Sequence, residues 1–547
     1  MGGEAAPSPQ TIAFMTPLRA VAVLLSAWLL GSCTPPAATA PGRGGEIRVA
    51  ISSDILSTNP GVLRDGNTDT VLYHIGESLV AYRDDMSVGP LLARTVALSE
   101  DRLTYTFTLR HGVRFHNGEP MTSAEVVWTW RRLLDPETGF RCLDDFDGSG
   151  ASGVRIESIT ATAPDQVVFR LNRPSALFLD RMASIQCLTA ILHPSSVDAA
   201  GAWTAPIGTG PYQLGEWRRG RSVTLERFDD YSPRSEPMSG LTGRKIAYAR
   251  RLVFVVTPDR LSAKASLYAG AIDLVFAAPI SAYGEMQRHA QRHGDVRVHR
   301  RDTLDWTVLL MQTRDPLLSD VRMRRAIAHA LSPRLITDVS SFGLAQPNSS
   351  AVMRASRFYN ARFAAWPAYD PALARRLARE AGYDGQVLTI QTNRKFPYMY
   401  DNAIAAQAML TAAGFNVRLE VSDWATQLSQ FQRGDFQLSA FGYSARSHPA
   451  LMYATFTGSR DVRGSYQWED PRALALVAQF EEVRDDAAMA LLLLQLHGLM
   501  QEDLPMVGLY NDEIVDLSRT SLTGYAPWAM GRPRLWGVQT TRPVSAP

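Results

Sequence analysis

The sequence lacks a hydrophobic run long enough to cross a membrane. The apolar stretch from Ala20 to Leu30 has 11 residues, whereas a spanning helix needs about 20, and no other stretch reaches about 18. A short apolar run that follows a positive residue and ends in small residues is typical of a secretory signal peptide. We therefore expect residues 1–32 to be a signal peptide. We expect its start at Met15, because Met15-Thr-Pro-Leu-Arg19 is a short positive segment.

The sequence also lacks a charge excess and the common catalytic motifs. Its formal net charge is +2, so there is no broad basic field of the kind that binds nucleic acid. Neither a Gly-x-Ser-x-Gly nucleophile turn nor a phosphate-binding P-loop occurs. We expect a binding protein without a cofactor rather than an enzyme. An enzyme remains an alternative, since catalytic triads are defined by geometry and not by chain order.

Cysteine is scarce, with three in 547 residues. The first, Cys33, ends the stretch Leu30-Gly-Ser-Cys33, which resembles the bacterial lipobox, where the cysteine is lipidated and becomes the mature N-terminus. Residues 33–44 are rich in Pro, Ala and Gly, which predicts a flexible tether. An ordinary cleaved signal peptide that happens to contain a cysteine is the alternative.

The other two cysteines, Cys142 and Cys187, form an even pair in a chain expected to reach an oxidising compartment. We predict a disulfide between them. On the chain-entropy model, closing a loop of about 45 residues stabilises the fold by roughly 4 kcal/mol. Two buried free thiols are the alternative.

Hydrophobic patterns predict a mixture of strands and helices. Large apolar residues alternate with threonine from Leu103 to Leu109, as in a half-buried strand. Thr122-Ser-Ala-Glu125 is a capping box that opens a helix, and Asp320 begins another. Asp370-Pro371 opens a further helix that closes at Gly382. Ala403 to Ala413 predicts a helix that leads into a strand, Asn416 to Val421. These elements indicate an α/β or α+β protein of several lobes.

Four segments resemble one known family. They are "GPLLARTVALSEDRLTYTFTLRHGVRFHNGEPMTSAEVVWTW" (89–130), "PIGTGPYQLGEWRRGRSVTLERFDDY" (206–231), "DPLLSDVRMRRAIAHAL" (315–331) and "YDPALARRLAREAGYDG" (369–385). In their order and spacing they are similar to the extracytoplasmic solute-binding proteins of family 5, the oligopeptide-, dipeptide- and nickel-binding components of ABC importers.

The resemblance implies the α/β fold of type II, cluster C periplasmic binding proteins, in which two lobes clamp a ligand and an extra subdomain is added. We expect the lobes to occupy these ranges: lobe I at 45–78, 206–300 and 504–547, the extra lobe at 79–205, and lobe III at 301–503.

The resemblance also implies the function. A periplasmic, lipid-anchored monomer would capture a peptide or peptide-like solute in the cleft and deliver it to an ABC permease and its ATPase. An anionic non-peptide solute, such as an opine or a sugar-phosphate conjugate, is the main alternative. A receptor or chaperone that acts without transport is a third.

The sequence departs from the family pattern at the expected ligand anchor. Peptide-binding members often have an aspartate there that holds the ligand ammonium, but the matching stretch, Phe441 to Pro449, has Arg446 near that position. A guanidinium repels an ammonium and attracts a carboxylate or phosphate. We expect Arg446 to contact the ligand; a salt bridge that closes the lobes is the alternative. The side chains that could line the cleft beside it, or equally belong to the core, are Tyr443, Trp424, Asp423 and Trp306.

Histidine spacing suggests a metal site that the surrounding charge argues against. His289 and His293 are four residues apart, with His299 beyond them, and such spacing can place two imidazoles on one helix face. Five arginines lie within the same segment and would repel a dication: Arg288, Arg292, Arg297, Arg300 and Arg301. We expect no metal here.

Overall fold

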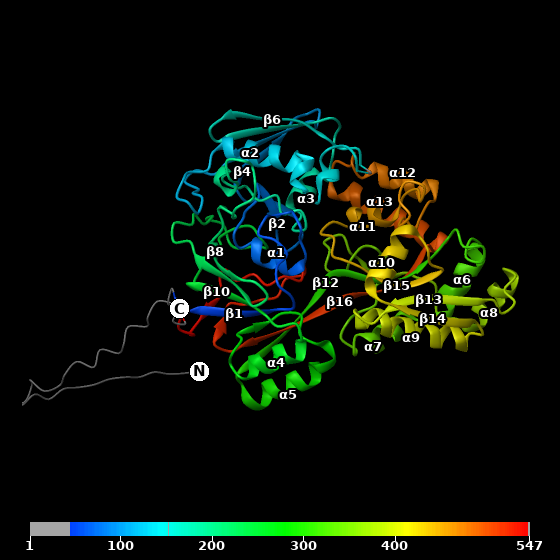
Figure 1. The fold of residues 1–547 in the computed structure, drawn as a ribbon. Coiled ribbons are helices and arrows are strands. Elements are labelled where there is room, and N and C mark those ends of the chain that lie inside the picture. The colour runs from blue at the N-terminus through cyan, green and yellow to red at the C-terminus, as the bar shows by residue number, and fades with distance from the viewer. Residues whose placement is uncertain (1–43, 151, 545–547) are drawn as a thin grey trace, which may run out of the picture. The chain divides into compact units, whose positions relative to one another are not determined.

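The computed structural model describes residues 44–150 and 152–544, so the predicted signal peptide and Cys33 lie outside the described residues. The main feature is a sheet of ten strands in the order β14-β13-β15-β12-β16-β11-β1-β10-β9-β8 (Figure 1). The strands are β1 (Glu46–Ile51), β8 (Tyr212–Arg218), β9 (Ser222–Arg227), β10 (Arg251–Val256), β11 (Leu274–Val275), β12 (Val296–Met311), β13 (Val387–Asn393), β14 (Asn416–Ser422), β15 (Leu438–Tyr443) and β16 (Met506–Arg519).

Two long antiparallel strands, β12 and β16, join the two ends of this sheet (Figure 1). We call β1 and β8–β11 the first half-sheet, and β13–β15 the second half-sheet. The start of β12 pairs with β16 alone, whereas its end, from Trp306 onward, pairs with both β16 and β15. Between these parts the register shifts, so that residues 303–305 lie opposite Asp512. Such a bulge redirects side chains, and here it lies where the chain passes between the half-sheets.

A separate antiparallel sheet has the order β4-β5-β7-β6, with β4 (Ala93–Leu98), β5 (Thr104–Leu109), β6 (Ile156–Ala163) and β7 (Gln166–Leu171). The predicted alternation is confirmed, because Tyr105, Phe107 and Leu109 are buried while the threonines between them are half-buried. Helix α2 (Ser123–Leu134) contacts β6 and β7. Its predicted capping box is present, with the Thr122 backbone N–H donating to Glu125 Oε2 at 2.8 Å.

Two helices beside the second half-sheet begin directly after the N-cap residues that the sequence predicted. Helix α6 (Val321–Ala330) begins after Asp320, and α8 (Pro371–Glu380) begins after Asp370, whose carboxylate accepts two backbone N–H bonds. Gly382, just past α8, has a φ of +81°, as a helix-ending glycine requires. Helix α9 (Pro397–Ala412) starts earlier than the predicted Ala403, because Pro397 occupies a first-turn position that needs no amide donor.

The remaining helices are α1 (Gly66–Leu72), α3 (Phe178–Ala183), α4 (Arg260–Tyr268), α5 (Tyr283–His293), α7 (Pro333–Ser340), α10 (Trp424–Arg433), α11 (Pro449–Phe456), α12 (Pro471–Gln479) and α13 (Asp486–Asp503). The short strands are β2 (Val80–Tyr82), β3 (Val88–Pro90), β17 (Leu522–Thr523) and β18 (Gln539–Thr540). Short 3₁₀ turns are Pro136–Thr138, Leu143–Asp145, Pro194–Ser196, Ile280–Ala282 and Ala361–Ala364. Within residues 44–150 and 152–544, none of the helices combines the length and the apolar character that a membrane crossing needs.

Candidate ligand-binding site

Arg446 lies in the segment between β15 and α11, and its side chain is half-buried. Its guanidinium donates only to backbone oxygens nearby, those of Ser444 at 3.1 Å and Ala445 at 3.2 Å. No carboxylate of the described chain lies within 4.0 Å of it. Burial lowers the pKa of Arg446, and the negative charges of Asp305 and Asp145 oppose that shift. The alternative to ligand contact, a salt bridge that closes the lobes, is therefore not formed within the described chain, and the guanidinium keeps hydrogen-bond donors for another partner.

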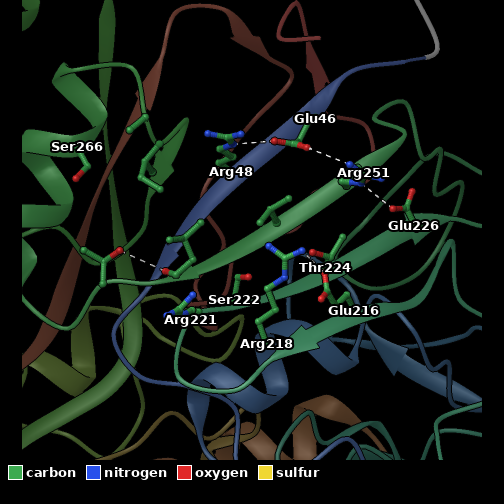
Figure 2. Close-up of a pocket in the computed structure, with 15 residues that line it drawn as sticks. Glu46, Arg48, Glu216, Arg218, Arg221, Ser222, Thr224, Glu226, Arg251 and Ser266 are labelled. Carbon is green, nitrogen blue, oxygen red and sulfur yellow. Dashed lines mark hydrogen bonds and ion pairs between the residues drawn. The ribbon is translucent and has the colours of Figure 1, made fainter. Parts of the chain in front are cut away.

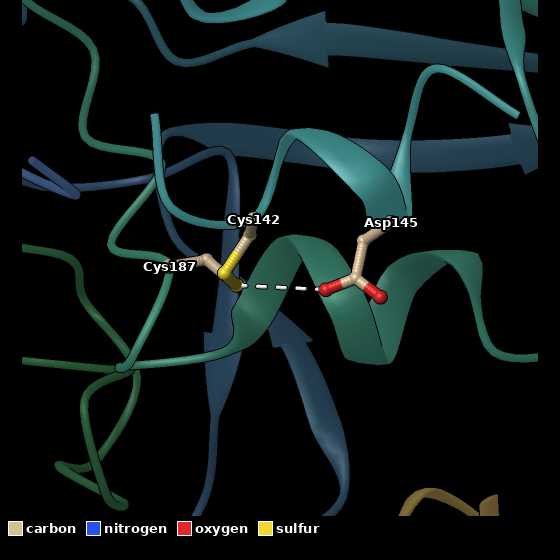
Figure 3. A group of neighbouring side chains, drawn as sticks. All are labelled: Cys142, Asp145 and Cys187. Atoms are coloured by element: carbon tan, nitrogen blue, oxygen red, sulfur yellow. Dashed lines mark hydrogen bonds between the residues drawn. A yellow bond between two sulfur atoms is a disulfide. The ribbon is translucent and has the colours of Figure 1, made fainter. Parts of the chain in front are cut away.

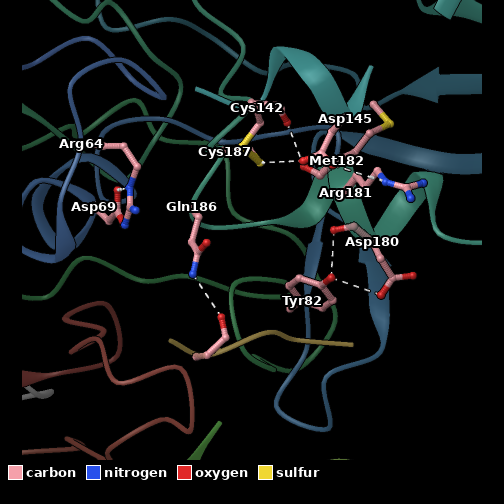
Figure 4. The surroundings of a disulfide bond; sticks show 12 residues. Arg64, Asp69, Tyr82, Cys142, Asp145, Asp180, Arg181, Met182, Gln186 and Cys187 are labelled. Atoms are coloured by element: carbon pink, nitrogen blue, oxygen red, sulfur yellow. Dashed lines mark hydrogen bonds and ion pairs between the residues drawn. A yellow bond between two sulfur atoms is a disulfide. The ribbon is translucent and has the colours of Figure 1, made fainter. Parts of the chain in front are cut away.

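The peptide unit of Ala445 fixes the backbone of this arginine from two sides. Its N–H donates to Asp305 Oδ1 at 2.7 Å. Its carbonyl accepts a bond from Gln186 Nε2 at 3.1 Å, and Gln186 lies in the segment that follows α3 (Figure 4). The loop that carries Arg446 is thus bonded both to β12 and to the part of the chain that includes the small sheet.

The β12 bulge places two carboxylates at the crossing between the half-sheets. Asp305 ends the bulge, and the backbone oxygen of Asp512 opposite accepts a bond from Thr303 Oγ1 at 2.9 Å. Burial raises the pKa of Asp305. Burial and then the charge of Asp305 raise the pKa of Asp512 to about 7. Neither carboxylate forms an ion pair with a described residue. Neither aspartate was predicted as a site residue, because neither belongs to a recognisable sequence motif.

Tyr443 and Trp306 lie side by side as a cross-strand pair of β15 and β12, with ring centroids 6.2 Å apart. Trp306 is fully buried, and its Nε1 donates to the backbone oxygen of Asn348 at 3.0 Å. Tyr443 is 5% exposed, and its hydroxyl has no partner in the described part of the chain. Burial raises the pKa of Tyr443, whereas the charge of Arg446 lowers it. Trp306 therefore belongs to the buried core, while the Tyr443 hydroxyl has no hydrogen-bond partner among the described residues.

The other two predicted residues lie at the start of α10. Asp423 is the N-cap, and its carboxylate accepts bonds from the Thr426 backbone N–H at 3.0 Å and from Thr426 Oγ1 at 2.6 Å. Trp424 is half-buried and stacks against Phe441 at 5.9 Å and edge-on against Phe396 at 4.9 Å. These contacts give Asp423 a structural role, and they place Trp424 behind Phe396.

A cavity of about 390 Å³ opens beside Phe396. Two of its wall residues, Phe396 and Arg532, come from beyond β12 in the chain, and the others come from the first half-sheet and its connections. The polar side chains that line it include Ser52, Ser53, Asp65, Asn67, Arg260 and Arg532. The sequence gives no signal for this set, because it is gathered from three distant parts of the chain.

The predicted disulfide is present between Cys142 and Cys187, with Cα atoms 5.5 Å apart (Figure 3). Asp145 lies beside the disulfide, with a carboxylate oxygen 3.9 Å from Cys187 Sγ. Because the two sulfurs are bonded to each other, they are not available as thiolate ligands for a metal ion. Arg181 Nε lies 3.6 Å from Asp145 (Figure 4), and Arg181 also pairs with the buried Glu481. The disulfide thus fixes the segment around α3, whose Arg181 contacts Glu481 just after α12.

A larger groove, of about 620 Å³, lies over β1 and β8–β10 (Figure 2). Six of its seven charged side chains pair with one another, namely Arg48 with Glu46 at 2.7 Å, Arg251 with Glu226 at 2.7 Å and Arg218 with Glu216 at 2.8 Å. Arg221 alone forms no ion pair with a described residue. Because these charges are matched locally, the groove is a weaker candidate than the cavity beside Phe396.

The histidines at which we expected no metal bond to other protein groups. His289 stacks on Tyr268, with ring centroids 3.7 Å apart, and its Nε2 lies 3.2 Å from Asp295. His299 Nε2 lies 2.9 Å from Ser518 Oγ. No group of three metal-ligating side chains that includes these histidines occurs in the described ranges.

Comparisons with known proteins agree with this architecture. Residues 87–463 match the family model of bacterial extracellular solute-binding proteins, family 5. The chain is 24% identical to the glutathione-binding protein GsiB of Salmonella paratyphi A, over 92% of this chain and 96% of that protein. It is 28% identical to Di/tripeptide-binding protein 4 of Pseudomonas aeruginosa, over 86% and 90%.

Among solved structures, the fold is similar to the ABC transporter-associated periplasmic binding protein DppA of Helicobacter pylori in complex with the peptide STSA. The TM-score is 0.75 at 23% identity, over 92% of this chain and 99% of that one. The mixed α/β architecture is that of the type II periplasmic binding proteins, as the resemblance implied. With more than half of its length matched by the family model, the chain belongs to the bacterial extracellular solute-binding proteins of family 5.

Proposed function

We propose that this chain is the substrate-binding lipoprotein of an ABC importer, which captures a peptide or peptide-like solute and delivers it to a membrane permease. The observation that carries the proposal is Arg446, a half-buried guanidinium without a carboxylate partner among the described residues. Membership of the solute-binding family supports it, and so does the similarity to a glutathione-binding and a di/tripeptide-binding protein. Such a protein binds and releases its solute without turnover.

The clamp would have two sides. Lobe I and the extra lobe, residues 79–205, form one side, and lobe III, residues 301–503, forms the other. Two contacts between these ranges support that division: Gln186 with Ala445 at 3.1 Å, and the buried pair of Arg181 with Glu481. A ligand that bridges the lobes shifts the population toward the closed form. In this proposal the protein is a periplasmic monomer held to the membrane by lipid on Cys33, and the permease and its ATPase are its partners.

Arg446 would grip a carboxylate of the solute through paired hydrogen bonds, which planar guanidinium groups favour. The free hydroxyl of Tyr443 lies within the field of the same arginine. In the stretch where relatives hold an ammonium with an aspartate, this chain has Arg446, so the acids that remain for a cationic end are Asp305 and Asp512. The bound solute would then carry both signs of charge, as a peptide does.

A non-peptide anionic solute, such as an opine or a sugar-phosphate conjugate, is the second candidate, because a cation at Arg446 suits any oxyanion. The two candidates differ in what Arg446→Ala does. Both lose affinity, but a peptide, which backbone bonds also hold, loses about threefold, whereas an oxyanion held chiefly by the guanidinium loses about tenfold or more.

Isothermal titration calorimetry of the purified full chain with trialanine and with a pool of short peptides tests the proposal. We expect saturable binding of at least one peptide, weakened in Arg446→Ala and unchanged in Arg379→Ala. Arg379 is an exposed arginine on α8 and serves as the matched control. Peptide binding that Arg446→Ala leaves intact would remove Arg446 from the site. Failure of every peptide to bind would overturn the peptide reading.

A further inference from the structure

The cavity beside Phe396 is rich in hydrogen-bond donors that have no acceptor in the described chain. Asn67 Nδ2 donates to Ser53 Oγ at 2.7 Å and to Ser52 Oγ at 3.3 Å. Both serine oxygens therefore act as acceptors toward Asn67, and their own hydroxyl protons remain available. No bond donated by either hydroxyl to a described residue is formed, and both serines are exposed to the cavity.

Arg532 supplies a cation to the same cavity. Its Nη1 donates to the backbone oxygen of Gly531 at 2.9 Å, which is a neighbour in the chain. Its Nε is buried and has no hydrogen-bond partner in the part of the chain that the structure describes. It forms no ion pair there. A buried charged donor without an acceptor is costly, so an external acceptor would stabilise this side chain.

The acids near Arg532 are already bonded to other groups. Asp65, also in the cavity wall, accepts bonds at Oδ1 from the Thr68 backbone N–H at 2.8 Å and from Thr68 Oγ1 at 2.7 Å. Asp69 is nearly fully buried and pairs with Arg64. Burial raises the pKa values of Asp69 and Asp305, and the charge of Arg532 opposes both shifts. Neither carboxylate lies within 4.0 Å of the Arg532 guanidinium.

The position of this guanidinium depends on Gly66, the first residue of α1. A Cβ atom on Gly66 would lie 2.5 Å from Arg532 Nη2 and 2.9 Å from its Cζ. Real Cβ atoms essentially never lie so close, so a methyl group at Gly66 would displace the guanidinium, which is the far end of a flexible side chain and can shift. Gly66 is not among the glycines with positive φ, so its lack of a side chain acts on the position of Arg532 through space and not through backbone angles.

We propose that Arg532, Ser52 and Ser53 form a second anion-binding subsite, which takes a carboxylate or phosphate group of the bound solute. The inference rests on the proposed function, since it assigns a second anchor in the same interlobe site. With Arg446 as the first anchor, the preferred solute carries two anionic groups. Burial raises the pKa of Asp305 at the β12 bulge, and the charges of both arginines oppose that shift. Arg260 in the same cavity wall adds to the positive potential.

The test compares peptides that differ by one anionic side chain. The probes are trialanine, the three tripeptides in which one alanine is replaced by glutamate, and the three in which it is replaced by phosphoserine. With the purified full chain, we expect at least one of the six acidic peptides to bind about tenfold or more tightly than trialanine, as a charge-assisted bond pair predicts. A glutamate preference identifies a carboxylate site, and a phosphoserine preference identifies a phosphate site.

Substitutions at the subsite should remove this preference selectively. In Arg532→Gln the acidic peptide and trialanine should bind within about threefold of each other, with the trialanine affinity unchanged. Gly66→Ala, which keeps the charge but occupies the space, should weaken the acidic peptide alone. Ser53→Ala should weaken binding of the acidic peptide about threefold. This smaller substitution keeps the test valid if Arg532→Gln fails to fold. Arg379→Gln should change nothing.

An acidic preference that survives in both Arg532→Gln and Ser53→Ala would overturn the inference and leave the proposed function intact. Equal binding of all seven peptides to the unaltered protein would also overturn the inference of a second anion subsite and leave the proposed function intact. Failure of all seven, and of the peptide pool, would instead overturn the proposed function together with this subsite.

Discussion

Replacing Asp512 by asparagine should stabilise the protein above neutral pH. Burial and the neighbouring charge of Asp305 raise the pKa of Asp512 from 3.8 to about 7. Between these two values the native state binds more protons than the unfolded chain, so the group's contribution to stability falls as pH rises. The shift sets an upper limit of about 4 kcal/mol. Because Asp512 is half-buried and water screens it, we expect about 1–2 kcal/mol.

Urea unfolding of the wild type and Asp512→Asn at pH 4.5, 6 and 8 measures this effect. The free energy of unfolding of the variant should exceed that of the wild type by about 1–2 kcal/mol at pH 8. The difference should be smaller at pH 4.5 and should vanish only below the unfolded-state pKa of 3.8. Asp305→Asn should shrink the pH-dependent part, since it removes the second cause of the shift. The exposed Asp384→Asn is the control. A variant less stable than the wild type at pH 8 would refute the reasoning.

Three further predictions concern the contacts around the disulfide. Replacing Cys142 and Cys187 by serine should lower the free energy of unfolding by about 2–4 kcal/mol in denaturant titrations; an unchanged value would contradict the loop-closure argument. Arg181→Met should cost about 3–5 kcal/mol because it leaves Glu481 buried without its partner, and adding Glu481→Met should restore much of that loss. Gln186→Ala should weaken trialanine binding severalfold in calorimetry with a thermal midpoint shift of about 2 °C or less, and a large loss of stability with unchanged binding would assign Gln186 a purely structural role.

Local patterns of the sequence predicted the elements that local physics determines. The strand at Thr104–Leu109, the capping box of α2 and the glycine that ends α8 all depend on residues within a few positions of one another. The disulfide also followed, because only two cysteines remain after the lipobox. Helix α9 was predicted too short, since Pro397 is read as a helix breaker unless the first turn is already known.

The candidate site was predicted only in part, because it is assembled from distant segments. Arg446 was found through its departure from the family pattern. Asp305 and Asp512 meet across a bulge whose register no periodicity reveals. Arg532 reaches its cavity through the space left by Gly66, which lies more than 400 positions earlier in the chain. Asp423 was predicted as a possible cleft residue although its position in the sequence indicates a helix cap, since Thr426 follows it by three residues and bonds to its carboxylate.

Peptide binding by this protein is best tested by native mass spectrometry of the purified full chain, followed by release and identification of any bound small molecule. We expect a discrete additional mass that corresponds to a short peptide or peptide-like solute with a free carboxylate, and its loss in Arg446→Ala but not in Arg379→Ala. A chain that carries no such mass, and whose thermal midpoint no peptide pool raises, would contradict the assignment of this protein as a peptide-binding component of an importer.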